Sequence, residues 1–230
     1  MNEARAAIFD AVRRALADTA STECSADADG PDLAGAALQP ATDGVRPAAG
    51  GMAHFRAVLE ELGAGFAEAL SAEAAADWIA GALAAAGVKR LAVVGAPGGP
   101  ALVARLGAAG IGLEPLDGLA PDACRRCLEE VPAVLTAADF ALERTGTLVF
   151  TPATLPFRGA AGLPPWHIAV LPHARVVADL AALFASHPEV TRQPLLFVSG
   201  PSRTADIEKT LVLGAHGPAR LDVVVVGGAA

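Results

Sequence analysis

The sequence predicts an α/β domain with a mainly parallel sheet flanked by helices, preceded by an N-terminal helical arm. Three observations support this prediction. Short apolar runs of strand length alternate with amphipathic stretches of helical length. The runs are rich in Val, Leu and Ala, as in strands that are buried on both faces. Glycine turns separate several of these runs from the helical stretch that follows.

The N-terminal region differs from the rest of the chain. Ile8, Val12 and Leu16 recur at helical spacing, which predicts an amphipathic helix. That helix either packs on its own domain or docks on a partner subunit. The next stretch is rich in Ser, Asp, Gly, Pro and Ala without periodicity, which is typical of a linker. The expected parts are a helix over 1–18, a flexible linker over 19–52 and an α/β domain over 53–230.

From residue 53 the hydrophobic pattern becomes regular. Two helices are expected first, over 52–70 and 71–87, with Ser71 as the N-cap of the second and Gly87 at its end. The elements expected after them are strand 90–94, glycine turn 95–99, helix 100–110, strand 111–116, helical turn 136–146, strand 147–150, strand 167–171, helix 175–187, buried strand 195–200, helix 205–212 and closing strand 221–226.

Composition excludes several classes of protein. The chain has 17 Lys and Arg against 25 Asp and Glu, for a net charge of −8, and its basic residues are scattered. A nucleic-acid backbone is therefore not expected as a partner. The N-terminus lacks a continuous apolar core, and no apolar run reaches the roughly 20 residues that cross a bilayer. Together with only three cysteines, these features predict a cytoplasmic protein without a transmembrane segment.

Three isolated features are weak signals of a site. Cys124 and Cys127 form a lone CxxC, whereas a zinc or iron–sulfur site needs about four ligands, so we expect two ordinary helical cysteines and no metal. The turn GAPGG over 95–99 joins a strand to a helix, where backbone N–H groups can meet an anion. It matches neither GxGxxG nor a P-loop. His167, in a predicted strand, is interpreted as a packed, hydrogen-bonded residue.

The strongest candidate site is the stretch SGPSRTADIEKTLVLGAHGP, residues 199–218. Asp206 and Glu208 fit the first turn of a helix, where acids complement the helix dipole. Helix capping does not explain why hydroxyl residues and Arg203 gather before that helix, or why His216 follows it. Arginine, hydroxyl and turn N–H groups together suit a carboxylate or phosphate. The predicted ligand-binding residues are Thr145, Gly146, Thr147, Arg158, Ser199, Gly200, Ser202, Arg203, Thr204, His216 and Gly217, and no catalytic residue is assigned.

The motifs SGPSRTADIE and LGAHGP, preceded by a TGT turn and LPPWHIAVL, resemble the LUD-domain family over residues 53–226. The resemblance implies a fold like that of the NagB/RpiA/CoA-transferase group. It also implies a part in the oxidation of L-lactate to pyruvate, as the subunit without iron–sulfur clusters in a LutABC-type system. The implied partners are LutA-like and LutB-like proteins that carry the clusters, and the implied ligand is a small organic acid. No cofactor is expected in this chain.

One position departs from the family pattern. The family has an acid directly before the TGT turn, whereas this chain has Arg144 there and Glu143 one residue earlier. A family role for an acid at this turn therefore does not carry over. Two alternatives stay open. One is a free-standing CoA-transferase-like enzyme for a phosphosugar, an acyl-CoA or a folate, with Glu143 as nucleophile. The other is a purely structural module.

Overall fold

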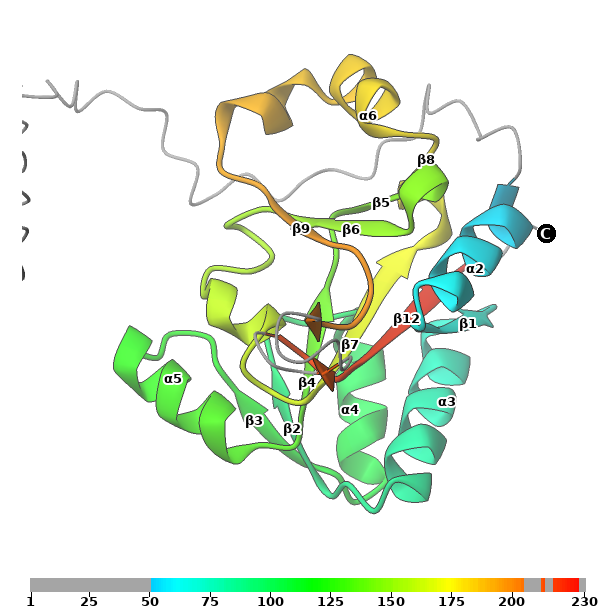
Figure 1. Cartoon of the computed structure of the whole chain (residues 1–230). Coiled ribbons are helices and arrows are strands. Elements are labelled where there is room, and N and C mark those ends of the chain that lie inside the picture. The colour runs from blue at the N-terminus through cyan, green and yellow to red at the C-terminus, as the bar shows by residue number, and fades with distance from the viewer. Residues whose placement is uncertain (1–50, 205–211, 214–216, 228–230) are drawn as a thin grey trace, which may run out of the picture. The chain divides into compact units, whose positions relative to one another are not determined.

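Six parallel strands form the main sheet, in the order β1-β12-β7-β4-β2-β3 (Figure 1). The computed structural model describes residues 51–204, 212–213 and 217–227. The predicted α/β class with a mainly parallel sheet is confirmed. The strands are β1 (Gly65–Ala69), β2 (Arg90–Val93), β3 (Gly112–Pro115), β4 (Ala133–Ala137), β7 (Trp166–Pro172) and β12 (Arg220–Val226).

Helices cover both faces of this sheet (Figure 1). On one face, α3 (Ala72–Ala85) and α4 (Pro100–Ala108) pack on alternate strand residues such as Ile168 and Val170. On the other face, α2 (Gly51–Glu61) and α5 (Pro121–Glu130) pack on the residues between them. Each aliphatic side chain buried in this way stabilises the fold by about 1.5–3 kcal/mol. As predicted, Ser71 caps α3, accepting a 3.2 Å hydrogen bond from the Ala74 N–H.

A second sheet, in the order β8-β5-β6-β9, packs against the α2 and α5 face of the main sheet through Leu148 and Phe150. Its other face forms a separate core with α6 (Leu180–Ser186) and the 3-10 helix η5 (Pro188–Arg192). Its strands are β5 (Phe140–Leu142), β6 (Thr147–Phe150), β8 (Val176–Val177) and β9 (Leu196–Val198). The remaining elements are η2 (Glu143–Thr145), η3 (Arg158–Ala161), η4 (His173–Arg175) and the antiparallel pair β10 (Arg203–Thr204) and β11 (Val212–Leu213).

The predicted helix over 52–70 is wrong in its second half, where the chain forms β1. The helix ends at Glu61, and Gly63 follows with a positive φ of 79°. Gly65 then lies against the carboxylate of Asp222, where any Cβ would overlap an oxygen of that side chain. Pairing with β12 explains the strand, since Ala67 and Ala69 face the core while Glu68 is exposed.

The helical turn predicted over 136–146 is also largely wrong. Its first residues end β4, and its middle forms β5, while only Glu143–Thr145 make a helical turn, of the 3-10 type. The sequence shows no period-2 alternation here because all residues of β5, and all but one of β4, are buried. Burial on both faces thus removes the pattern that marks a strand.

Three later predictions are corrected. Of the predicted helix 175–187, only Leu180–Ser186 is α-helical, because Val176–Val177 pair with β5. The strand predicted over 195–200 exists as β9, but it is not buried, since Phe197 is 44% exposed. The predicted helix 205–212 is wrong at Val212, which lies in β11. Residues 205–211 of that prediction lie outside the described residues, as do the predicted N-terminal helix and linker.

Candidate functional site

Three side chains from the predicted site form a chain of hydrogen bonds, which we call the hydroxyl cluster: Thr145, Thr147 and Ser199. The Oγ1 of Thr147 lies 2.7 Å from the Oγ1 of Thr145 and 2.7 Å from the Oγ of Ser199. Thr147 and Ser199 are 52 residues apart in sequence. The antiparallel pairing of β6 with β9 joins them, because Leu148 faces Val198 one step along the ladder. Thr147 is buried, while Thr145 and Ser199 are exposed.

Two glycines of the predicted site allow close packing beside this cluster. Gly146 has a φ of 61°, and a Cβ there would lie 2.9 Å from the Leu62 Cδ1 and 3.0 Å from the Val58 Cγ1. Gly200 has a φ of 82°, and its Cβ would lie 3.1 Å from the Leu62 Cβ. Both turns therefore pack against the residues at the end of α2. Only glycine suits this combination of positive φ and close approach.

The two turns of the stretch 199–218 meet in space. The Ser202 N–H donates a 2.9 Å hydrogen bond to the Pro218 carbonyl. A Cβ at Gly217 would lie 3.1 Å from the Ser202 Cβ, so these two residues are in contact distance. The sequence prediction that Ser202 and Gly217 belong to one region is consistent with this geometry.

Four predicted site residues remain: Arg158, Arg203, Thr204 and His216. Arg203 and Thr204 pair with β11 and form a short strand rather than a turn. Arg158 begins η3 and is exposed, and in the described part of the chain no hydrogen bond or ion pair links it to the hydroxyl cluster. His216 lies outside the described residues.

The two residues before the TGT turn, Glu143 and Arg144, have surroundings that indicate structural roles. Glu143 is only 3% exposed, which disfavours the alternative in which it serves as an accessible nucleophile. Arg144 donates through its Nη2 to the Asp179 carboxylate at 3.0 Å, and its N–H donates to the Ala178 carbonyl. Asp179 is in turn the N-cap of α6. Arg144 thus anchors the start of α6.

His167 and Trp166, from the LPPWH motif, have packing roles. His167 is fully buried, and its Nε2 lies 2.8 Å from the Thr136 Oγ1, so the interpretation as a packed, hydrogen-bonded residue is confirmed. Burial lowers the pKa of His167 to about 4, which keeps the ring neutral. The Trp166 Nε1 donates to the Asp222 carboxylate at 3.0 Å, and the Arg220 guanidinium covers the indole at 3.8 Å.

The cysteine pair lies on α5, as predicted. The Cys124 thiol donates to the Leu116 and Leu119 carbonyls, and the Cys127 thiol donates to the Glu114 carboxylate. Burial raises the pKa of Cys127 to about 11, which disfavours the reactive thiolate. Within the described ranges no group of three or more His, Cys, Asp or Glu could hold a metal ion.

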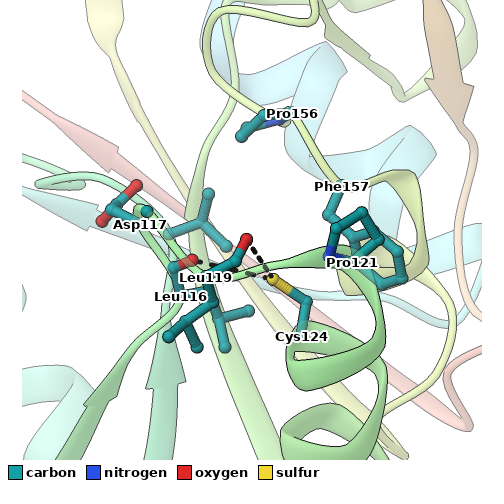
Figure 2. A pocket seen from close by; sticks show the side chains of 9 residues that line it. Leu116, Asp117, Leu119, Pro121, Cys124, Pro156 and Phe157 are labelled. Carbon is teal, nitrogen blue, oxygen red and sulfur yellow. Dashed lines mark hydrogen bonds between the residues drawn. The ribbon is translucent and has the colours of Figure 1, made fainter.

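A cavity of about 260 Å³ opens at the carboxyl ends of β2 and β3, and we call it the carboxyl-edge cavity. Figure 2 shows Asp117 on the opposite side from Pro121 and Phe157, with Leu116, Leu119 and Cys124 at its base. The Asp117 carboxylate accepts the Gly95 N–H at 2.9 and 3.1 Å. The negative charge at this glycine turn disfavours the anion that the turn GAPGG alone suggested.

Sequence reasoning missed this cavity. The available signal was Asp117, an acid directly after a strand and 22 residues beyond the glycine turn of a preceding strand. Its neighbours Leu116, Leu119 and Phe157 read as ordinary apolar residues in sequence. Only the packing of α5 and the segment around Phe157 brings them together.

The structure is thus that of an α/β protein with a hydroxyl cluster beside close-packed glycines. The LUD domain family model matches residues 52–226, and the chain belongs to this family. None of the helices in the described residues is long and apolar enough to cross a membrane.

The relatives are distant. A lactate utilization protein C from Halalkalibacterium halodurans is 35% identical over 104 residues, 43% of this chain and 45% of that protein. A lactate utilization protein C from Deinococcus radiodurans is 39% identical over 105 residues, 44% of this chain and 49% of that protein. The alignments thus span about half the length of these relatives. A crystal structure of a DUF162 family protein from D. radiodurans is similar with a TM-score of 0.56 and 28% identity, covering 76% of this chain and 95% of that one.

Proposed function

We propose that this chain is the subunit without iron–sulfur clusters of a LutABC-type system that oxidises L-lactate to pyruvate. Membership of the LUD domain family and the two relatives called lactate utilization protein C support this role. The observation that carries the proposal is the hydroxyl cluster, because it joins the TGT turn to the SGPS turn, two motifs of the family resemblance.

We propose a small organic acid as the ligand of this region. The exposed hydroxyls of Thr145 and Ser199 are donors that suit a carboxylate, and a guanidinium such as that of Arg203 would supply the charge. Gly146 and Gly200 let both turns pack closely on Leu62, which holds the two hydroxyl residues in place. The proposed partners are LutA-like and LutB-like proteins that carry the iron–sulfur clusters.

Deletion tests the role in the cell. In a host with no other lactate oxidase, loss of the gene for this chain should abolish growth on L-lactate but not on pyruvate. Normal growth on L-lactate after the deletion would contradict the proposed role in lactate oxidation. Purification of the tagged chain from lactate-grown cells should also bring down two iron–sulfur proteins.

Complementation tests the site. Ser199→Ala with Thr145→Val removes the exposed hydroxyls and should slow growth on L-lactate severalfold while the protein level stays constant. Thr191→Val with Ser186→Ala removes two hydroxyls on and beside α6, and should restore growth fully. If both double variants restored growth equally well, the hydroxyl cluster would have no part in the proposed function.

A further inference from the structure

The order of the strands places a crevice at the carboxyl ends of β2 and β3. β2 lies between β3 and β4 in the sheet. The helix α4 joins β2 to β3 on one face, and α5 joins β3 to β4 on the other face. The chain therefore leaves the neighbouring strands β2 and β3 toward opposite faces of the sheet. In open α/β sheets, ligands bind outside the carboxyl ends of the strands at such a switch point.

The carboxyl-edge cavity lies at this switch point. Val94 directly follows β2, Leu116 and Leu119 follow β3, and Pro121 and Cys124 belong to α5. Its volume of about 260 Å³ lies just below the range of roughly 300–1,000 Å³ for whole ligand pockets. The cavity therefore suits a ring system that is buried while the rest of the ligand stays at the mouth.

The residues that line the cavity indicate the chemical class of its ligand. Phe157 and Pro121 lie together on one side of the cavity, and their apolar rings suit contact with a planar ring (Figure 2). Asp117 is an exposed carboxylate and the one charged side chain among the lining residues. Each of its oxygens accepts the Gly95 N–H and retains a further lone pair. A carboxylate accepts hydrogen bonds from hydroxyls and repels acids.

We propose that the carboxyl-edge cavity binds a ribonucleoside, with the base between Phe157 and Leu119 and the vicinal ribose hydroxyls on Asp117. The separation of 22 residues between Gly95 and Asp117 matches the spacing of about 20 residues between a glycine turn and a ribose-binding acid. The turn GAPGG lacks the full dinucleotide fingerprint, so the ligand can be a free nucleoside or the nucleoside part of a coenzyme. This proposal goes beyond the lactate role and does not depend on it.

Equilibrium binding to the full-length protein tests the proposal, with adenosine, guanosine, cytidine and uridine as probes and 2′-deoxyadenosine as the comparison. At least one ribonucleoside should bind with saturation, and loss of the 2′-hydroxyl should weaken adenosine binding about tenfold. NAD and FAD, whose adenosine ribose keeps both vicinal hydroxyls, then distinguish the sources, because tighter binding of either assigns the site to that coenzyme and weaker binding to the free nucleoside. No binding of any ribonucleoside at millimolar concentration overturns the proposal.

Matched variants locate the site. Asp117→Asn keeps an acceptor for the Gly95 N–H but loses the charge, and should weaken nucleoside binding about tenfold. Asp122→Asn, on α5 outside the lining residues, should leave binding unchanged. Leu119→Glu should abolish binding, whereas Leu163→Glu should not, since the two leucines are 45% and 44% exposed. Binding that survives both Asp117→Asn and Leu119→Glu contradicts the assignment.

Discussion

The hydroxyl cluster and the carboxyl-edge cavity differ in how tightly their surroundings are packed. At the hydroxyl cluster, Gly146 and Gly200 press against Leu62, so the turns that carry the family motifs have almost no free space on that side. At the cavity, Gly118 has a similar positive φ, of 76°, but a Cβ there would meet nothing within 4 Å. A glycine-containing motif can therefore mark close packing, whereas a ligand-sized space can lie where no motif points.

Alanine at the two glycines tests this difference most strongly. Gly146→Ala should reduce the free energy of unfolding by about 3 kcal/mol, because a left-handed backbone strain adds to overlap with Leu62 and Val58. Gly118→Ala has the backbone strain alone and should cost about 1 kcal/mol. Urea denaturation of both variants measures the difference. Equal losses would mean that the turn at Gly146 can move away from α2.

The contact between His167 of the main sheet and Phe150 of the second sheet is expected to make the fold less stable in acid. The His167 ring packs 5.8 Å from that of Phe150 in the second sheet, and burial lowers the pKa of His167 from 6.5 to about 4. The unfolded chain therefore binds a proton that the folded chain excludes. The contribution of His167 is present above pH 6.5 and is lost as the pH falls towards 4. Between pH 7 and pH 5 this group alone should remove about 2 kcal/mol of stability.

His167→Gln isolates that contribution, because glutamine keeps polar atoms but does not titrate. The difference in unfolding free energy between the wild type and this variant should shrink as the pH falls from 7 to 5. Denaturant unfolding at several pH values measures it. A difference that stays constant over this interval would show that the ring is charged or solvated in the folded protein.

The hydrogen bonds of the hydroxyl cluster should have a smaller effect. Thr147→Val keeps the shape of this buried side chain but leaves the Thr145 and Ser199 hydroxyls without their common partner. We expect a loss of about 1 kcal/mol in the free energy of unfolding, measured by urea denaturation. Thr191→Val, at an exposed position, should change it by less than about 0.5 kcal/mol. A loss as large as that of Gly146→Ala would make hydrogen bonding rather than packing the main support of this turn.

The smallest expected effect is that of the ion pair beside the turn. The Arg144 side chain is 72% exposed, so Arg144→Ala should cost at most about 0.5 kcal/mol, and less in high salt. Thermal unfolding at low and high salt measures it. A loss of several kcal/mol would show that the start of α6 depends on this ion pair, in contrast to the glycine packing.

Prediction from sequence succeeded where the local pattern and the tertiary environment agree. Ser71 caps α3 as expected, since a serine before a helical stretch satisfies a free N–H wherever that helix packs. Strands β2, β7 and β12 were also predicted correctly. A short continuous apolar run that ends in a turn is typical of a buried strand. Prediction failed at β1, which reads as the continuation of a helix, because only pairing with β12 makes it a strand.

The candidate site, like the fold, could be predicted only in part from the sequence. The sequence alone indicated Thr145, Thr147 and Ser199 as residues of one site, and it carried the resemblance to the LUD-domain family. It could not show that β6 and β9 are neighbours, because their pairing joins residues about 50 positions apart. It also could not show Asp117 beside Gly95 or the space between Leu119 and Phe157.

The α/β class, the family and the chemical types of side chain in the polar turns could all be inferred from the sequence. These depend on local periodicity and on residue identity, which need no partner from elsewhere in the chain. Three further features follow from the folded structure: β5, β6, β8 and β9 form a second sheet, Gly146 and Gly200 meet Leu62, and a cavity opens beside β2. Each of these depends on long-range packing, whose energy is shared among residues far apart in the chain.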